Sequence, residues 1–382
     1  MATHRTRKQP IDFRKEEVGY VMQRWRASDS CSLIGVGSVG KSNLLQHLSK
    51  PDVQKVYMDL ADTDHFKAII IDPNMLGPLP KEGGADFDQV RCWAGYELMM
   101  HRLFMAFYPF EGMDPEEAER FYDIYQSLQN GNNPLYAYMG LRYFELGLDF
   151  FIRRGIRLVF MFDEFEDMLR YLPVKFFQTL RGLRDINKRY LSYLTFTRAP
   201  LPALVEKFNI PELEIESFVE LFTDGLYYVG PYNPADARRM VDNLMDRNQK
   251  YYPDDSVEFL MWATGRYAGL MRSTFRLMDV LGPIDGTGRM NDEILRTLVK
   301  RRSIREECAT LWKSLSGIEH HVLKSVAGLR KYEINSETEQ GVAMLVQKRL
   351  LRVDRNQQRL HIEPPVFRVF VMSNPESETD IG

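Results

Sequence analysis

Cysteine is scarce in this sequence, and long apolar runs are absent. The three cysteines among 382 residues are isolated and have no metal-ligand spacing: Cys31, Cys92 and Cys308. This pattern excludes a disulfide scaffold and a cysteine-based zinc site, and it favours a reducing compartment. No apolar run reaches the roughly 20 residues that a membrane-spanning helix needs. The basic first ten residues also lack the apolar segment of a signal peptide. We therefore expect a cytoplasmic protein that does not associate with membranes.

The sequence also has no internal repeat and no low-complexity tract. With 44% hydrophobic and 27% charged residues, it has the composition of a globular protein long enough for two or three domains. The net charge of −3 is unevenly distributed. Between Arg296 and Met372 there are 15 basic and 8 acidic residues, a balance of +7, whereas the rest of the chain carries −10. A basic C-terminal module raises the question of nucleic-acid binding.

Residues 13–200 have the pattern of an α/β domain built on a parallel sheet. Four short apolar runs alternate with helical segments, and each run is bounded by polar residues, as expected of strands covered on both faces. These runs are residues 32–36, 68–72, 158–163 and 193–197. An aromatic-rich stretch at about residues 86–154 predicts a helical insertion. Residues 1–12 and 373–382 are expected to be loose ends.

Two further domains are expected after residue 200. Helical patterns dominate residues 201–294, which predicts a helical lid. Residues 295–372 have the order of a winged helix, with three helices before a two-stranded hairpin. Ser336 and Glu339 have the spacing of a capping box and predict the start of the third helix. The hairpin strands are expected at residues 351–354 and 358–362, with the turn at residues 355–357.

A complete phosphate-loop motif follows the first predicted strand. Its fixed positions, G-x-x-x-x-G-K-[ST], are occupied by Gly35, Gly40, Lys41 and Ser42. In such a loop the backbone N–H groups point at the phosphates, and the following helix adds the positive end of its dipole. Lys41 is expected to reach the β- and γ-phosphates, and the Ser42 hydroxyl to ligate Mg²⁺. We therefore predict a nucleotide-binding segment made of Gly35, Val36, Gly37, Ser38, Val39, Gly40, Lys41, Ser42 and Asn43.

An acidic motif ends the third predicted strand. Five apolar residues precede Asp163 and Glu164. We expect this strand to lie beside the phosphate-loop strand, which would bring Asp163 to the Mg²⁺ site and let Glu164 orient and partly deprotonate the attacking water. Together with Lys41, these two carboxylates are the predicted catalytic residues. Glu166 and Asp167, further along, are expected to face solvent.

ATP is the expected nucleotide. Guanine-specific P-loop proteins usually carry N-K-x-D, and the only Asn-Lys pair here, Asn187 and Lys188, is not followed by that aspartate. Such proteins also carry D-x-x-G, whereas the sequence after Asp163 continues Glu-Phe-Glu. Both departures favour ATP and ADP over guanine nucleotides.

With these residues in place, the sequence resembles the AAA+ superfamily. It is most similar to the signal-transducing STAND and archaeal-type ATPases, which are close relatives of the initiator ATPases. The resemblance covers about residues 13–370 and is specific at the phosphate loop and at Asp163 and Glu164. It implies an α/β P-loop ATPase domain followed by a helical lid domain and a winged-helix domain.

The resemblance also implies nucleotide contacts outside the two motifs. Arg198 ends a strand like the family's sensor strand, where a guanidinium can face the γ-phosphate and distinguish ATP from ADP. Arg272 follows a Gly-rich helix start that resembles the one near the second sensor. Arg14 matches an arginine that lies near the base in such families, and His361 falls where some STAND winged helices carry a histidine. The sequence leaves open whether Arg14 or His361 contacts nucleotide.

Three functions are compatible with these motifs. The favoured one is a Mg²⁺-dependent ATPase that acts as a regulatory switch, changing domain arrangement or oligomeric state between ATP and ADP. Self-association would supply a neighbour's arginine to the γ-phosphate, and an unidentified protein would be the partner.

The alternative is a DNA-binding initiator- or transposition-type ATPase that uses the winged helix. Glu337 and Glu339 on the reading helix argue against base contacts, although the arginines of the wing and the basic run at residues 300–305 could hold a DNA backbone. The third function, a nucleotide-binding scaffold without turnover, is disfavoured by Glu164.

Replacing the lysine of the phosphate loop tests the nucleotide-site assignment. Lys41→Ala removes the cation expected on the β- and γ-phosphates. ATP affinity should therefore fall at least tenfold, which corresponds to about 1.4 kcal/mol or more. Calorimetric titration with ATP measures this change, and an unchanged affinity would contradict the assignment of the loop.

Overall fold

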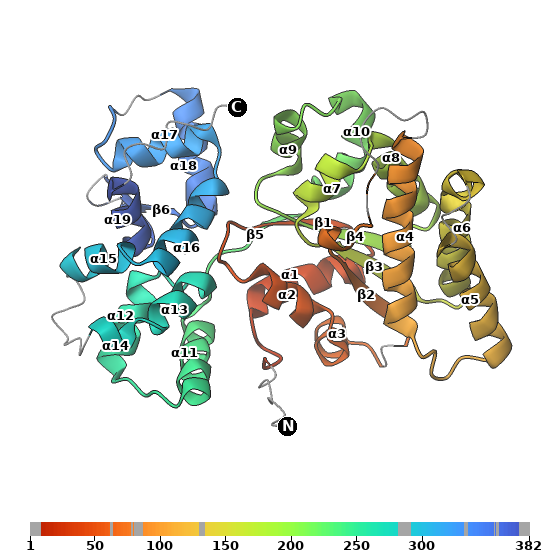
Figure 1. Cartoon of the computed structure of the whole chain (residues 1–382), viewed down its shortest axis with the longest axis horizontal. Helices are drawn as coiled ribbons and strands as arrows, with labels where there is room; N and C mark the ends of the chain where they lie inside the picture. Colours follow the sequence, from red (N-terminus) through yellow and green to blue (C-terminus); the bar gives the residue numbers. More distant parts are fainter. Residues whose placement is uncertain are drawn as a thin grey trace. The chain divides into compact units, whose positions relative to one another are not determined.

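The computed structural model describes residues 9–61, 64–77, 79, 87–129, 134–281, 292–331, 335–354, 356 and 359–373. The chain forms two compact units (Figure 1). The first, called here the α/β unit, consists of Lys15–Ile34 and Ser42–Tyr227. The second, called the C-terminal unit, consists of Met1–Arg14, Gly35–Lys41 and Tyr228–Gly382. Most of the two segments predicted to be loose ends, residues 1–8 and 374–382, lies outside the described residues.

The α/β unit is built on a five-stranded sheet in the order β2-β3-β4-β1-β5. Its strands are β1 (Cys31–Ile34), β2 (Phe66–Ile71), β3 (Arg157–Phe162), β4 (Leu191–Thr197) and β5 (Leu226–Tyr228). The pairs β2–β3, β3–β4 and β4–β1 are parallel. All residues of β1 and β4 are buried, as expected of inner strands covered on both faces. The four predicted strands are thus confirmed to within a few residues.

Two features of this sheet differ from the prediction. The strand that carries the acidic motif, β3, does not lie beside the phosphate-loop strand β1, because β4 pairs with both of them and separates them. A fifth strand, β5, lies next to β1 as the outermost strand of the sheet, in a segment where helical patterns dominate the sequence. With only three residues, of which none is buried, β5 gives a short and weak strand signal.

Helices pack around the sheet, and three of them form the insertion on the side of β2 and β3. The shorter ones are α1 (Lys15–Arg26), α2 (Lys41–Leu48), α3 (Pro51–Met58), α7 (Phe165–Tyr171), α8 (Val174–Ile186), α9 (Leu201–Lys207) and α10 (Glu212–Val219), with 3-10 turns at Pro73–Met75 and Glu220–Phe222. The predicted insertion is helical: α4 (Phe87–Phe107), α5 (Pro115–Gln129) and α6 (Pro134–Ile152). Helix α4 packs on β2, α6 reaches β3, and α5 packs against both helices (Figure 1).

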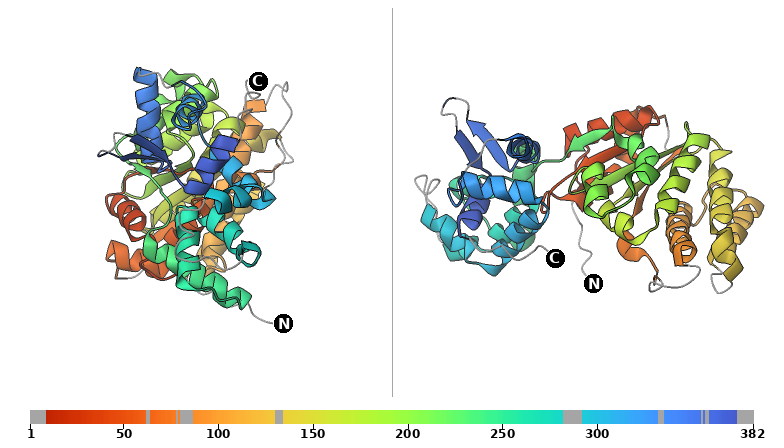
Figure 2. Two further views of the ribbon diagram at one scale, coloured as in Figure 1. Left: turned by 90° about the vertical axis from the view of Figure 1, so that its left-hand side faces the viewer. Right: turned by 90° about the horizontal axis from the view of Figure 1, so that it is seen from above.

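The C-terminal unit contains the predicted lid and winged-helix elements. The lid helices are α11 (Pro234–Asn248), α12 (Asp254–Ala263), α13 (Ala268–Phe275) and α14 (Met278–Leu281). They are followed by α15 (Asp292–Val299), α16 (Arg302–Lys313), α17 (Gly317–Val326), α18 (Ser336–Gln347), the strands β6 (Leu351–Asp354) and β7 (Arg359–Ile362), and α19 (Pro365–Ser373). Strands β6 and β7 form an antiparallel hairpin that lies beside α17 and α19 (Figure 2).

The winged helix departs from the prediction at two points. The capping box of α18 is formed by Asn335 and Thr338, one residue earlier than the predicted pair Ser336 and Glu339. The extended backbone at Asn335 places its side chain, and not that of Ser336, on the free N–H groups of the first turn. In addition, α19 follows the hairpin and buries an apolar face that includes Val366, Phe367 and Phe370.

The cysteines are buried, and none has the environment of a reactive thiol. All three are free of disulfide bonds. Burial raises the pKa of both Cys31 and Cys92 to about 12 and raises that of Cys308 as well. They act as small apolar side chains. Among the helices of the described residues, none combines the length and the apolar character needed to cross a bilayer.

The insertion depends on an aromatic cluster centred on Phe121. This fully buried ring of α5 contacts Phe104 of α4 and Phe151 of α6, with ring centroids 6.3 Å and 4.8 Å away. Phe121→Ala should destabilise the α/β unit by about 3 kcal/mol or more, because it leaves a cavity between three helices. Differential scanning calorimetry should show a lower melting temperature. The neighbouring Tyr122 is 43% exposed, and Tyr122→Ala should change the melting temperature much less. Equal effects of the two variants would contradict this account of the core.

Candidate functional site

The inner strands of the sheet end side by side. Their register pairs Cα positions near the carboxyl ends, Ile34 with Thr197 and Phe162 with Thr195. The residues that directly follow these three strands are Gly35 after β1, Asp163 after β3 and Arg198 after β4. Because the strands are parallel, these chain positions all lie at the carboxyl end of the sheet. Ligands of open α/β sheets bind at this end.

The phosphate loop connects β1 to α2, as the motif predicts. Strand β1 ends at Ile34 and α2 begins at Lys41. Ser38 and Gly40 have positive φ angles of 62° and 88°, and these left-handed residues curl the backbone of the loop. Most of the loop is buried, whereas Ser42 at the start of α2 is exposed.

A buried arginine holds the loop from within the C-terminal unit. Arg14 is only 1% exposed. Its guanidinium donates to the carbonyl oxygen of Val39 and, at 3.1 and 3.2 Å, to that of Gly230. It also lies over the ring of Tyr232, 4.7 Å from the centroid, and its backbone N–H donates to Asp236 at 2.9 Å. Arg14 thus joins the N-terminal segment, the phosphate loop and the start of the lid; its contact with a base stays a prediction.

The first turn of α13 packs on the same loop. The Gly269 N–H donates to the carbonyl oxygen of Ser38 at 3.0 Å. A Cβ atom added at Gly40 would lie 3.4 Å from the Cβ of Ala268 and 2.9 Å from the Tyr232 hydroxyl, so a larger residue would crowd the lid. Arg272 lies four residues after Ala268, on the same face of the helix, and its side chain is exposed.

The acidic motif and Arg198 form one cluster in the α/β unit. The Arg198 guanidinium pairs with Glu164 at 3.1 Å, and the Arg198 N–H donates to Glu166 at 2.9 Å. The Glu166 side chain is only 9% exposed and its carboxylate lies 3.8 Å from the Arg198 Nε. The prediction that Glu166 faces solvent is therefore wrong, because α7 begins at Phe165 and turns this side chain back toward the end of β4.

The backbone beside this cluster is strained. Glu164 has a left-handed conformation, with φ 42° and ψ 47°, and it is the N-cap residue of α7. Its N–H donates to the carboxylate of Asp163 at 3.0 Å. A non-glycine residue in this conformation is uncommon and concentrates at functional sites. The turn thus places two successive carboxylates directly after β3.

One buried hydroxyl at this sheet edge has no partner among the described residues. Thr197, the last residue of β4, is fully buried, and its Oγ1 makes no hydrogen bond there. A buried polar atom of this kind needs a bound group or water to satisfy it. Thr197 lies directly before Arg198, at the carboxyl end of β4.

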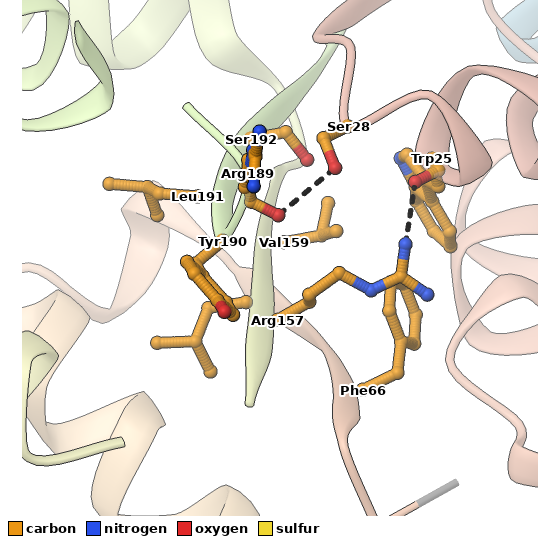
Figure 3. Close-up of a pocket in the computed structure, with 10 residues that line it drawn as sticks. Trp25, Ser28, Phe66, Arg157, Val159, Arg189, Tyr190, Leu191 and Ser192 are labelled. Atoms are coloured by element: carbon orange, nitrogen blue, oxygen red, sulfur yellow. Dashed lines mark hydrogen bonds between the residues drawn. The ribbon is translucent and has the colours of Figure 1, made fainter. Parts of the chain in front are cut away.

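Two further features bear on the predicted site residues, each within its own unit. His361 is on β7, with its Nε2 4.0 Å from the carboxylate of Asp354 within the hairpin. The hollow in Figure 3 lies at the opposite ends of β3 and β4, between Trp25, Arg157 and Tyr190. Its volume of about 10 Å³ holds no more than one water molecule, so it is not a nucleotide pocket.

No family model matches the chain, and no curated protein sequence matches it. Among solved structures, the Walker-type ATPase paby2304 of Pyrococcus abyssi is similar, with a TM-score of 0.51 and 14% identity over 94% of this chain and 95% of that one. The ORC2 protein of Aeropyrum pernix, in ADPNP–ADP complexes, gives a TM-score of 0.49 and 12% identity over 95% and 92%.

The first of these likenesses covers nearly the whole length of both chains. The sequence identity is too low to carry more than architecture. The chain therefore has the AAA+ P-loop ATPase fold, with a helical lid and a winged helix after the sheet.

Proposed function

We propose that this protein is a Mg²⁺-dependent ATPase that acts as a nucleotide-controlled switch. The observation that carries the proposal is the common sheet edge at which the phosphate loop, the acidic motif and Arg198 leave three adjacent strands. Phosphate-binding backbone, carboxylates for metal and water, and a cation that can respond to the γ-phosphate are the parts that ATP hydrolysis requires.

The donor set suits a magnesium nucleotide. The Ser42 hydroxyl and the Asp163 carboxylate are hard oxygen ligands of the kind that Mg²⁺ prefers, and the ion would neutralise charge on the β- and γ-phosphates. Lys41 would bind the same phosphates, and the free hydroxyl of Thr197 supports a polar ligand at this edge. Glu164 would orient the attacking water and accept its proton. Arg272, exposed on α13, would contact nucleotide from the lid.

The switch part of the proposal is supported by the Arg198 ion pairs. Arg198 is paired with Glu164, and a γ-phosphate would compete for the same guanidinium because it is a stronger anion. Binding of ATP would then release Glu164 for catalysis, and loss of the γ-phosphate would restore the pair. A ligand shifts an equilibrium by its differential affinity for the two states, and Arg198 would supply that difference. Self-association and an unidentified protein partner remain part of this proposal.

A DNA-dependent ATPase is the second candidate. The favouring observation is a cluster of exposed basic residues at the start of α16: Lys300, Arg301, Arg302 and Arg305. Against it, the first turn of α18 exposes Glu337 and Glu339, which would repel phosphates in a groove. Of the wing arginines, Arg352 already pairs with Glu363 at 3.2 Å. The charges therefore favour the switch.

Replacing the proposed base tests the catalytic assignment. Glu164→Gln preserves the shape and the hydrogen-bonding oxygen but removes the basic carboxylate. Nucleotide and Mg²⁺ binding should be kept, while turnover should fall roughly 100-fold or more. Steady-state phosphate release measures this loss. Asp167→Asn is the matched control, since Asp167 lies on α7 and pairs with Arg170 at 3.6 Å; its turnover should stay near that of the parent. Parent-like turnover of Glu164→Gln would contradict the assignment.

Replacing Arg198 tests the switch. Arg198→Ala should bind ADP about as well as the parent but should lose the ATP-dependent change in domain arrangement or oligomeric state. Light scattering and limited proteolysis with ATP, ADP and no nucleotide detect this loss.

Arg170→Ala is the control for this experiment, because that arginine is 54% exposed and lies on the neighbouring helix α7. It should respond to ATP like the parent. If Arg198→Ala also responds like the parent, Arg198 is not the sensor. If the parent distinguishes ATP from ADP only after duplex DNA is added, the DNA-dependent ATPase replaces the switch.

A further inference from the structure

Gly37 is a glycine that the phosphate-loop motif does not require. The motif fixes only Gly35, Gly40, Lys41 and Ser42, and the third position is free. Gly37 is also not among the described glycines with a positive φ angle. The reason for glycine is a close approach: a Cβ atom would collide with the Thr310 methyl group and lie 3.0 Å from the Thr310 carbonyl oxygen. Because that oxygen belongs to the backbone of α16, it cannot move aside as a side chain can.

A second contact joins α16 to the next residue of the loop. The Ser38 hydroxyl donates to the carboxylate of Glu307. Glu307 lies three residues before Thr310, on the same face of the helix. Gly269 completes the contact, since a Cβ atom there would lie 2.7 Å from the Ser38 Oγ and would collide with Glu307. Two glycines outside the fixed motif positions thus make room for α16 on the phosphate loop.

This contact brings an uncompensated negative charge to an anion-binding loop. Glu307 is half-buried, and no cation pairs with it among the described residues. Its neighbour Glu306 is different, because it is 60% exposed and pairs with Arg302 at 2.7 Å. The buried guanidinium of Arg14, which also contacts the loop, donates to the carbonyl oxygens of Val39 and Gly230. A partly desolvated carboxylate is weakly screened, so it repels phosphates bound in the same loop.

We propose that Glu307 is an affinity-determining residue that weakens nucleotide binding by the phosphate loop. The inference rests on the proposed function and extends it to a residue outside the nucleotide motifs. The coupling is reciprocal: if Glu307 opposes phosphates, phosphates oppose the contact between Ser38 and Glu307. Nucleotide binding therefore loosens α16 from the loop. Through α16 the winged helix then responds to whether nucleotide is bound.

The test compares ADP and ADPNP binding to full-length variants by calorimetry at low and high salt. Glu307→Gln keeps the hydrogen bond to Ser38 but removes the charge, so ADP affinity should rise at least threefold. The gain should shrink as salt increases. Glu306→Gln, one residue away and equal in charge change, should stay within twofold of the parent.

Ser38→Ala supplies a second variant should Glu307→Gln fail to fold. It removes the hydrogen bond that holds the carboxylate on the loop and should also tighten ADP binding. Combined with Glu307→Gln it should be clearly less than additive, because the two residues act through one contact.

Unchanged or weaker ADP binding by Glu307→Gln overturns the inference, and so does an equal gain in Glu306→Gln or a gain that salt does not reduce. A salt-independent gain would point to repacking of α16 instead of charge. These failures are distinct from failure of the proposed function, which would show itself as parent-like nucleotide binding by Lys41→Ala.

Discussion

The parallel pairing of β4 with both β1 and β3 determines where the proposed nucleotide residues of the α/β unit lie. It places the ends of three strands next to one another, with Ile34 opposite Thr197 and Phe162 opposite Thr195. Chain positions more than a hundred residues apart thereby meet at one sheet edge. The same pairing buries all seven residues of β4 and leaves the Thr197 hydroxyl without a partner among the described residues. Packing and site geometry therefore depend on the same strand.

Charge is arranged differently in the two units. In the α/β unit, one cation, Arg198, pairs with Glu164 and lies close to Glu166, so two carboxylates share one guanidinium. In the C-terminal unit, Arg14 binds carbonyl oxygens, while the carboxylate of Glu307 contacts the loop through a neutral hydroxyl. A charge that is held near a ligand site without a counter-ion acts on the ligand. The pairing of Glu164 with Arg198 suits the proposal that ATP releases Glu164. The carboxylate of Glu307, which pairs with no cation among the described residues, suits the proposal that it opposes nucleotide binding.

Much of the fold was predictable because its signals are local. Buried parallel strands are short apolar runs, and the phosphate loop needs particular residues at adjacent positions. Three features were not predicted correctly from the sequence. Strand β5 is only three residues long, the capping box of α18 starts at Asn335, and Glu166 is turned inward by the start of α7. Strand β5 and the inward position of Glu166 depend on how a short segment meets a distant one, which periodicity does not report. The capping box depends on the local backbone conformation at Asn335.

The sequence by itself determined where the phosphate-loop motif and the acidic strand end lie, and it predicted adenine nucleotides, because each follows from residue types at fixed spacing. Only the tertiary structure decided that β4 separates β1 from β3, that Arg198 pairs with Glu164, and that α16 packs on the loop at Gly37 and Ser38. The physical reason is distance along the chain. Ser38 and Glu307 are separated by 269 residues, and no local rule of backbone geometry or periodicity relates residues so far apart.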